Sequence, residues 1–278
     1  MPRARFPATT GLDAGRLLPI LMVGWLLVAC GSSSSTRTVE IASTSSSSTP
    51  VVSTTTVEVV SDLPSSTTAA AVTADSLPEG SSLVGQAAAH VEIFDGPELA
   101  APSYVLESAT SLGSPRVFLV ETGPVDGWVE VSLPIRPNGS TGWVRAGALD
   151  LDVIDYAIFV DLSDRRLRLE RGEEVVLDTA VAIGSPHNPT PTGSYFVTDI
   201  VELTDPGGPW GPFALGLSAF SDTITEFNGG NGIIGIHGTN RPASIGEPVS
   251  LGCVRVPNEI AAQLAELVKL GTPVEIVE

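Results

Sequence analysis

The sequence predicts a mainly β protein with two folded units that follow a long non-globular segment. Its 278 residues exceed one average domain and fall short of three. Hydrophobic residues make up 42% of the chain, which is enough for real cores. From residue 83 onward, short β-rich runs alternate with Gly, Pro and Asn turns, and one stretch near the C-terminus has the periodicity of a helix.

Charge and composition exclude several classes of function. Lys+Arg 14 against Asp+Glu 32 leaves a formal charge of −18, which repels nucleic-acid phosphates. Aromatic residues make up only 5%, which also argues against base-stacking platforms. Two Cys and three His cannot complete a Cys/His zinc site without carboxylates, and we expect neither a metal nor another cofactor. A binding module or an enzyme with a small catalytic constellation remains.

Residues 1–29 are expected to be a secretory signal. Three arginines precede an apolar run over 17–27 that is too short to span a bilayer comfortably. Small residues followed by Cys30 end the run, and this pattern resembles the bacterial lipoprotein signal. The resemblance implies that Cys30 is lipidated and holds the chain on the outer face of the bacterial plasma membrane. An ordinary signal or an anchor helix with an incidental cysteine is the alternative.

Residues 30–82 are predicted to be a disordered tether that begins at the lipidated cysteine. Nearly half of residues 31–80 are Ser or Thr, and none is aromatic. Such a segment cannot bury enough apolar surface to offset its chain entropy. A coil of about 50 residues reaches roughly 40 Å on average, so the folded units would work at a distance from the membrane.

Residues 83–151 are predicted to form a small all-β module. Strand-like runs of four to six residues are separated by turns, which is typical of a small barrel or sandwich. Two Gly-Trp-Val units flank the turn at 137–140 and resemble the ends of bacterial SH3-like modules. We expect Trp128 and Trp143 to pack in a core rather than to stack on sugars.

Residues 153–278 are predicted to form a second β-rich unit. Alternating apolar residues over 156–170 predict a hairpin. The run 258–270 places its apolar residues on one face and predicts a helix that Asn258 would cap. A closing strand is expected over 272–277.

The candidate chemistry lies in two short segments, 235–239 and 250–255. Once Cys30 is lipidated, Cys253 is the only thiol of an exported chain, where a thiol without a task is an oxidation liability. His237 lies 16 residues earlier, and two strands joined by a loop would bring its imidazole beside the sulfur. An imidazole that accepts the thiol proton, and later returns one to a leaving amine, would support nucleophilic catalysis.

Four neighbours have expected supporting roles. The backbone carbonyl of Gly238 would orient the imidazole through its second nitrogen. Gly252 allows close approach of the backbone, and its amide together with that of Cys253 would form an oxyanion hole. Ser250 and Arg255 would support that loop or hold a substrate carboxylate.

These residues carry a family resemblance. The string closely resembles the signature of L,D-transpeptidases of the YkuD type, in the order His237-Gly238, then Ser250-x-Gly252-Cys253-x-Arg255. The resemblance spans about 153–277 and includes a Thr-Pro-Thr-Gly segment at 190–193. Many members have a second His where this chain has Leu251, so the upstream His237 is the expected base.

The resemblance implies a β-rich catalytic domain that cross-links peptidoglycan stem peptides. Cys253 would attack a tetrapeptide stem at the carbonyl of its third residue and expel the terminal D-alanine. The side-chain amine of another stem would then resolve the thioester to a 3→3 cross-link. Carbapenems would be expected to acylate Cys253.

Two alternatives stay open. An L,D-carboxypeptidase would use the same thioester, because water and amine compete for it. A non-catalytic wall-binding lipoprotein with a decayed enzyme domain is the other, and the intact motif argues against it. His90 and His187 are expected at the surface or the rim. The loop 207–212 is the best candidate for a substrate lip, although a plain structural loop fits equally well.

Overall fold

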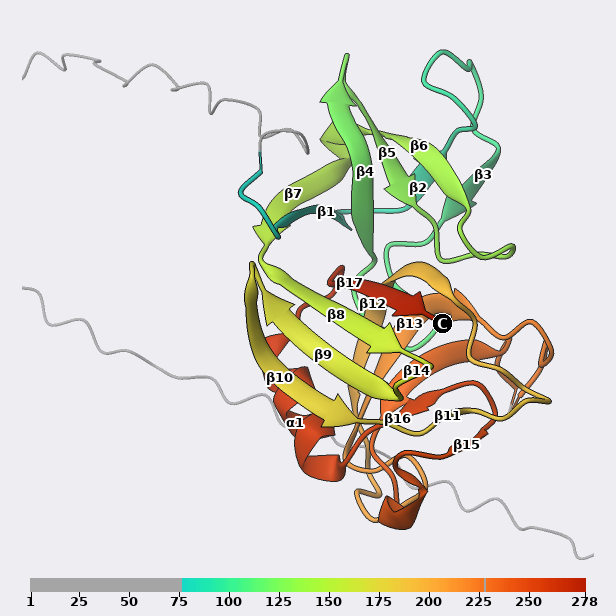
Figure 1. Cartoon of the computed structure of the whole chain (residues 1–278). Helices are drawn as coiled ribbons and strands as arrows, with labels where there is room; N and C mark the ends of the chain where they lie inside the picture. The colour runs from blue at the N-terminus through green and yellow to red at the C-terminus, as the bar shows by residue number, and fades with distance from the viewer. Residues whose placement is uncertain (1–76, 228) are drawn as a thin grey trace, which may run out of the picture. The chain divides into compact units, whose positions relative to one another are not determined.

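The computed structural model describes residues 77–227 and 229–278 (Figure 1). The predicted signal, the lipidated Cys30 and nearly all of the predicted tether lie outside these residues. Within them the chain is mainly β and has one α-helix, as predicted. No helix among the described residues is long and apolar enough to cross a membrane.

The first sheet has five antiparallel strands in the order β6-β5-β4-β1-β7. Its strands are β1 (Ser82–Ala87), β4 (Val117–Val125), β5 (Trp128–Ser132), β6 (Thr141–Arg145) and β7 (Leu149–Ile154). A short antiparallel pair, β2 (Val91–Ile93) and β3 (Tyr104–Leu106), accompanies the sheet, and a 3-10 turn (Ala146–Ala148) precedes β7. We call this part, residues 77–154, the β module.

The β module has its own core, formed because apolar residues alternate along its strands. Trp128 is buried, as predicted, and its ring meets that of Phe94 edge to face at 5.0 Å. Trp143 is only partly buried, so the expectation of a core role holds for it in part. The likeness to SH3-like modules stays a prediction.

The second sheet has eight strands in the order β10-β9-β8-β17-β12-β13-β14-β16. They are β8 (Tyr156–Asp161), β9 (Arg166–Arg171), β10 (Glu174–Ala180), β12 (Gly193–Glu202), β13 (Phe213–Phe220), β14 (Ile233–His237), β16 (Val254–Arg255) and β17 (Pro273–Val277). This part of the chain also contains a separate parallel pair of short strands, β11 (Ile183–Gly184) and β15 (Pro248–Ser250), and a 3-10 turn (Pro242–Ser244). The predicted hairpin over 156–170 is β8–β9, and the predicted closing strand is β17.

The eight-stranded sheet curls around a single core. Figure 1 shows β8, β9 and β10 in front of β12, β13 and β14. Buried side chains from both sets meet between them, among them Ile158, Leu169, Leu215 and Ile236. β17 joins the two sets, since it pairs in parallel with β8 and antiparallel with β12.

The one helix, α1 (Asn258–Leu267), packs against β13 and β14 and buries Ala261 and Leu264. It ends three residues earlier than the sequence predicts. The predicted cap is wrong: Pro257 occupies the N-cap position, and no side chain caps the helix. The Asn258 side chain turns instead toward the end of β14.

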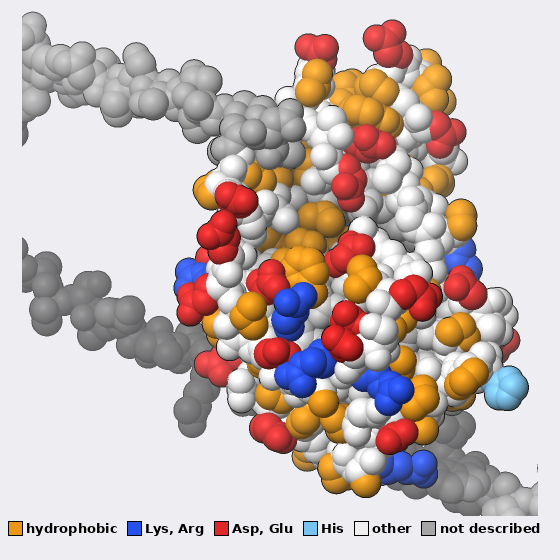
Figure 2. All heavy atoms as spheres, in the orientation of Figure 1, with side chains coloured by type: hydrophobic (Ala, Val, Ile, Leu, Met, Phe, Trp, Pro, Cys, Tyr) orange, Lys and Arg blue, Asp and Glu red, His pale blue; other side chains and the backbone are white. Residues whose placement is uncertain are grey.

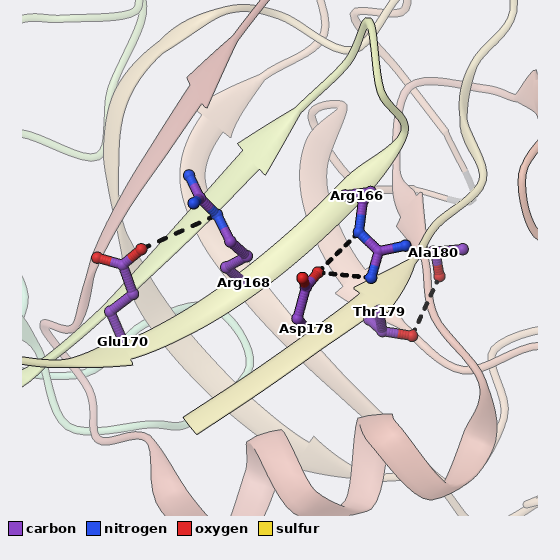
Figure 3. A network of polar contacts seen from close by, with 6 residues as sticks. All are labelled: Arg166, Arg168, Glu170, Asp178, Thr179 and Ala180. Atoms are coloured by element: carbon purple, nitrogen blue, oxygen red, sulfur yellow. Dashed lines mark hydrogen bonds and ion pairs between the residues drawn. The ribbon is translucent and has the colours of Figure 1, made fainter. Parts of the chain in front are cut away.

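The outer face of β9 and β10 faces solvent and carries charged side chains, although Val175 and Val176 of β10 are also exposed. Arg166 and Asp178 form an ion pair at 2.7 Å across these strands, and Arg168 lies 3.9 Å from Glu170 (Figure 3). Such exposed pairs contribute about 0–1 kcal/mol each. Basic side chains lie among acidic ones over this face (Figure 2). The candidate chemistry lies at the opposite edge of the sheet, at β14 and β16.

Candidate active site

Two neighbouring parallel strands bring the motif segments together. β14 pairs with β16 so that Ile236 lies opposite Val254 and His237 opposite Arg255. Cys253 immediately precedes β16. Because side chains alternate between the faces of a strand, Cys253 and Arg255 point to the same face, two positions apart. The predicted meeting of the 235–239 and 250–255 segments is therefore present in the fold.

One cavity of about 250 Å³ lies over this face and contains both proposed reacting groups. It is lined mainly by apolar side chains, and its charged lining residue is Arg255. The lining residues are Pro209, Trp210, Ser221, Ile224, Phe227, Gly232, Ile233, Ile234, His237, Ser250, Leu251, Cys253 and Arg255. A mostly apolar cavity with a few convergent polar groups is typical of a ligand site.

One ring nitrogen of His237 is hydrogen-bonded to the backbone, which fixes the orientation of the imidazole. Its side chain is 5% exposed, and Nδ1 lies 2.6 Å from the carbonyl oxygen of Gly238. A carbonyl only accepts, so Nδ1 carries the proton and Nε2 keeps its lone pair. The Trp210 ring packs on the imidazole with its centroid 4.6 Å away. This is the orienting hydrogen bond that the sequence predicts for Gly238.

Burial sets the charge of the imidazole. It lowers the pKa of His237 to about 4, with the Gly238 hydrogen bond opposing the shift and the Arg255 charge adding to it. The ring is therefore neutral at pH 7. A neutral imidazole with a fixed tautomer is ready to accept a proton at Nε2.

Cys253 is partly buried and forms no disulfide within the described residues. Burial raises the pKa of its thiol, and this outweighs the lowering effects of the Gly235 backbone amide and of the Arg255 charge. The resting pair is thus a thiol and a neutral imidazole rather than a thiolate and an imidazolium. The thiol proton would have to leave as the sulfur attacks.

The Ser250 hydroxyl organises the turn before the cysteine. It is 1% exposed, donates to the carbonyl oxygen of Cys253 at 2.6 Å and accepts from the backbone amide of Gly252 at 3.1 Å. The Gly252 amide is therefore used inside the turn, which differs from its predicted place in an oxyanion hole. Of the two predicted donors, this leaves the amide of Cys253. The expectation that Ser250 supports the loop agrees with these contacts.

Close packing at the end of β14 explains why positions 211 and 238 are glycines. Asn258 Oδ1 accepts from the Thr239 amide at 2.6 Å. A Cβ placed on Gly238 would lie 2.4 Å from that oxygen, and one placed on Gly211 would lie 2.5 Å from it. The Trp210 loop, the end of β14 and the start of α1 thus meet without room for side chains. Sequence reasoning missed this role of Asn258, because a polar residue at a helix start looks like a cap.

Some of the remaining predicted residues line the cavity and others do not. Arg255 lies opposite His237, and its buried Nε has no hydrogen-bond partner within the described residues. The predicted lip contributes Pro209 and Trp210 to the cavity. His90 and His187 are exposed and do not line it, as predicted. Within the described residues, no group of three or more His, Cys, Asp or Glu side chains lies close enough together to hold a metal.

Sequence reasoning also missed one wall of the cavity. The loop 221–232, between β13 and β14, contributes Ser221, Ile224, Phe227 and Gly232. Its signal in the sequence is only the Gly-rich stretch at 229–232, which predicts a turn and not a binding surface.

Comparisons with known proteins agree with the motif. The family model described as the YkuD L,D-transpeptidase catalytic domain matches residues 155–276. A Bacillus licheniformis protein that carries the name L,D-transpeptidase YkuD is 37% identical over 151 residues, 52% of this chain and 83% of that protein. Its namesake in Bacillus subtilis is 37% identical over 133 residues, 48% of this chain and 73% of that protein.

Solved structures give a weaker likeness. An L,D-transpeptidase from Mycobacterium smegmatis is 16% identical, with a TM-score of 0.38 over 68% of this chain and 99% of that one. The family model and the two Bacillus proteins identify the family.

Proposed function

The chain belongs to the YkuD family of L,D-transpeptidases, and from this premise we propose that it joins peptidoglycan stem peptides by 3→3 cross-links through a thioester on Cys253. Members of this family are cysteine-dependent acyltransferases. The residue assignment rests on one observation: Cys253 and His237 line the same cavity. The Nδ1 atom of the imidazole is hydrogen-bonded to the carbonyl oxygen of Gly238.

The first half of the reaction acylates the enzyme. As Cys253 Sγ attacks the carbonyl carbon of the third stem residue, its proton passes to His237 Nε2. The tetrahedral intermediate collapses, the bond to the terminal D-alanine breaks, and the imidazolium returns its proton to the departing amine. The products are a thioester on Cys253, free D-alanine and a neutral imidazole. The Cys253 backbone amide is the donor that we assign to the developing oxyanion.

The second half transfers the acyl group. The side-chain amine of another stem attacks the thioester carbonyl and loses a proton to His237 Nε2. The carbon–sulfur bond breaks, the sulfur takes that proton back, and an amide joins the two stems. Water in place of the amine gives a free carboxylate, which is the L,D-carboxypeptidase reaction. We assign the guanidinium of Arg255, which lines the cavity, to a substrate carboxylate, because a guanidinium binds carboxylates through paired hydrogen bonds.

Carbapenems should acylate the same sulfur, because their strained lactam carbonyl reacts with a thiol activated in this way. The test is mass spectrometry of the protein after incubation with imipenem, with Cys253→Ala as the matched variant. We expect one covalent adduct on the unmodified sequence and none on Cys253→Ala. An adduct of equal yield on both proteins, or none on either, would refute Cys253 as the nucleophile.

Incubation with tetrapeptide stems then separates the two activities. A cross-linked dimer with release of D-alanine supports transfer, and a tripeptide alone supports hydrolysis.

We also propose that the enzyme is a lipoprotein that works in the cell wall beyond the outer face of the plasma membrane. The support is sequence alone: the basic and apolar run before Cys30 and the Ser/Thr-rich segment after it. Deletion of part of 31–80 should lower cross-linking in cells and spare activity on soluble peptides. Equal loss in both assays would contradict the tether.

A further inference from the structure

The loop 221–232, which we call the cavity loop, is bound by the β module. Residue 228 of this loop lies outside the described residues. Facing the loop is the turn between β5 and β6, residues 133–140, which we call the module turn. Two side chains of the module turn, Arg136 and Asn138, make hydrogen bonds to the backbone of the cavity loop and of Phe220 just before it.

Arg136 joins both ends of the cavity loop. Its Nη1 donates to the carbonyl oxygen of Ser221 at 2.9 Å, and its Nη2 donates to that of Asn231 at 3.0 Å. A longer contact of 3.4 Å runs from Nη2 to the carbonyl oxygen of Ile224. The guanidinium also lies over the Phe220 ring, 5.0 Å from its centroid. A planar fork with several donors suits such converging carbonyls, and a single ammonium does not.

Asn138 fixes the point where the cavity loop leaves β13. Its Nδ2 donates to the carbonyl oxygen of Phe220 at 2.8 Å, and its Oδ1 accepts from the Phe220 amide at 2.9 Å. The side-chain amide thus satisfies both backbone groups of one residue, as a neighbouring strand would. This matters at Phe220, because the pairing of β13 with β14 shifts register between Gly216 and Phe220.

The carbonyls that Arg136 binds converge only when the cavity loop is folded. Ser221 Oγ accepts from the amides of Thr223 and Ile224, and the Ser221 amide donates to the carbonyl oxygen of Gly232. A Cβ on Gly232 would lie 2.0 Å from the carbonyl oxygen of Ile224, so the two ends of the loop are in close contact. The same folded loop presents Ser221, Ile224, Phe227 and Gly232 to the cavity.

We propose that Arg136 and Asn138 are positioning residues for the substrate, so that the β module supplies the support for one wall of the catalytic cavity. The proposal rests on the proposed function, because the wall matters only if Cys253 is acylated there. It assigns to the module a role inside the reaction, besides any role in reaching the cell wall. Loss of either side chain should weaken the reaction of acyl donors that must occupy the cavity and leave the thiol itself intact.

The test compares two reagents on the full-length protein. Imipenem must occupy the cavity to acylate Cys253, whereas iodoacetamide needs only an accessible thiol. We expect Arg136→Ala and Asn138→Ala to lower the second-order rate constant for imipenem about tenfold, with no decrease in the iodoacetamide rate. Arg136→Lys should lose about threefold, since one ammonium reaches fewer carbonyls. Arg145→Ala is the matched control, because Arg145 stacks on Trp128 within the module at 4.4 Å, and it should react as the unmodified protein does.

The outcomes separate this inference from the proposed function. Imipenem rates within twofold of the unmodified protein for both alanine variants would overturn the positioning role. A parallel fall of both reagent rates would also overturn it, because the damage would then reach the thiol and its base. If the unmodified protein forms no imipenem adduct, the proposed function fails first and this inference fails with it.

Discussion

The two sides of the cavity are built differently. On the side of β14 and β16, His237 and Ser250 are 5% and 1% exposed, and their polar atoms bond to the backbone of their own segments. On the side of the cavity loop, Phe227 is 41% exposed, and the loop is held by turns of its own and by two side chains of the β module. The reacting groups are thus fixed by the sheet, and the opposing wall is fixed partly by its own turns and partly by the β module.

This difference predicts that the two sides of the cavity control different steps, the chemical reaction and the binding of the acyl donor. Substitutions on the strand side should change the rate of bond making, because they alter the proton acceptor, the nucleophile or the turn that presents it. Substitutions on the loop side should change which acyl donors bind well. The following experiments test that division, from the largest expected effect to the smallest.

Replacement of His237 by Ala should lower acylation by imipenem about 10²–10⁴-fold, the usual contribution of a general base. The thiol stays protonated at neutral pH, so without the imidazole nothing takes its proton. Stopped-flow measurement of the acylation rate checks this. His187→Ala, at an exposed position outside the cavity, is the control and should react normally. A loss below tenfold in His237→Ala would move the base elsewhere.

The pH dependence of alkylation tests the neutral resting pair. Burial lowers the pKa of His237 to about 4, below its ordinary value, and raises the pKa of the Cys253 thiol. Iodoacetamide reacts with the thiolate, whose fraction grows about tenfold per pH unit below the thiol pKa. We therefore expect the alkylation rate to rise about 100-fold between pH 6.5 and 8.5. A rate that is flat over this range would indicate a thiolate–imidazolium pair instead.

Ser250→Ala should cost stability and activity together. The change leaves the Gly252 amide and the Cys253 carbonyl without their hydroxyl partner in a buried turn, a loss of about 1–3 kcal/mol. We expect a thermal midpoint several degrees lower and an acylation rate about tenfold lower. Ser103→Ala, at an exposed position in the β module, should change neither. An unchanged acylation rate in Ser250→Ala would show that this turn does not present the nucleophile.

Phe227→Ala should have the smallest effect, confined to binding. The ring lines the cavity but is 41% exposed, so its removal exposes little new surface. We expect KM for a stem peptide to rise two- to fivefold with kcat unchanged, as measured by D-alanine release. Val176→Ala, at a position on β10 that is 42% exposed and lies outside the cavity, is the apolar control with matched exposure. A fall in kcat with KM unchanged would place the ring in the chemical step.

The sequence predicted the strand side of the cavity much better than the loop side. His237 and Cys253 lie in local motifs, and the apolar strand before His237 leads directly to the pairing of β14 with β16. The hairpin β8–β9 and helix α1 follow from periodicities of two and 3.6 residues. These features depend on neighbours in the chain, which a sequence displays.

The loop side depends on contacts that no local pattern records. The bonds from Arg136 to Ser221 and to Asn231 join residues 85 and 95 positions apart. Asn138 is predicted to be a turn residue, and it is one. Its side chain also bonds to the backbone of Phe220, a contact that the sequence pattern does not predict. On the strand side, the Gly252 amide differs from its predicted place because it donates to the Ser250 hydroxyl two residues earlier in the chain.

The position of β17 has a consequence for how the enzyme is assembled. Residues 273–277 lie between β8 and β12, so the front and rear halves of the curled sheet share no ladder until this strand arrives. A chain that ends before β17 would still contain Cys253, but the two halves of its sheet would not enclose a core. Proteolytic removal of this short piece would therefore disable the protein as surely as loss of the sulfur, from a point that never meets the substrate.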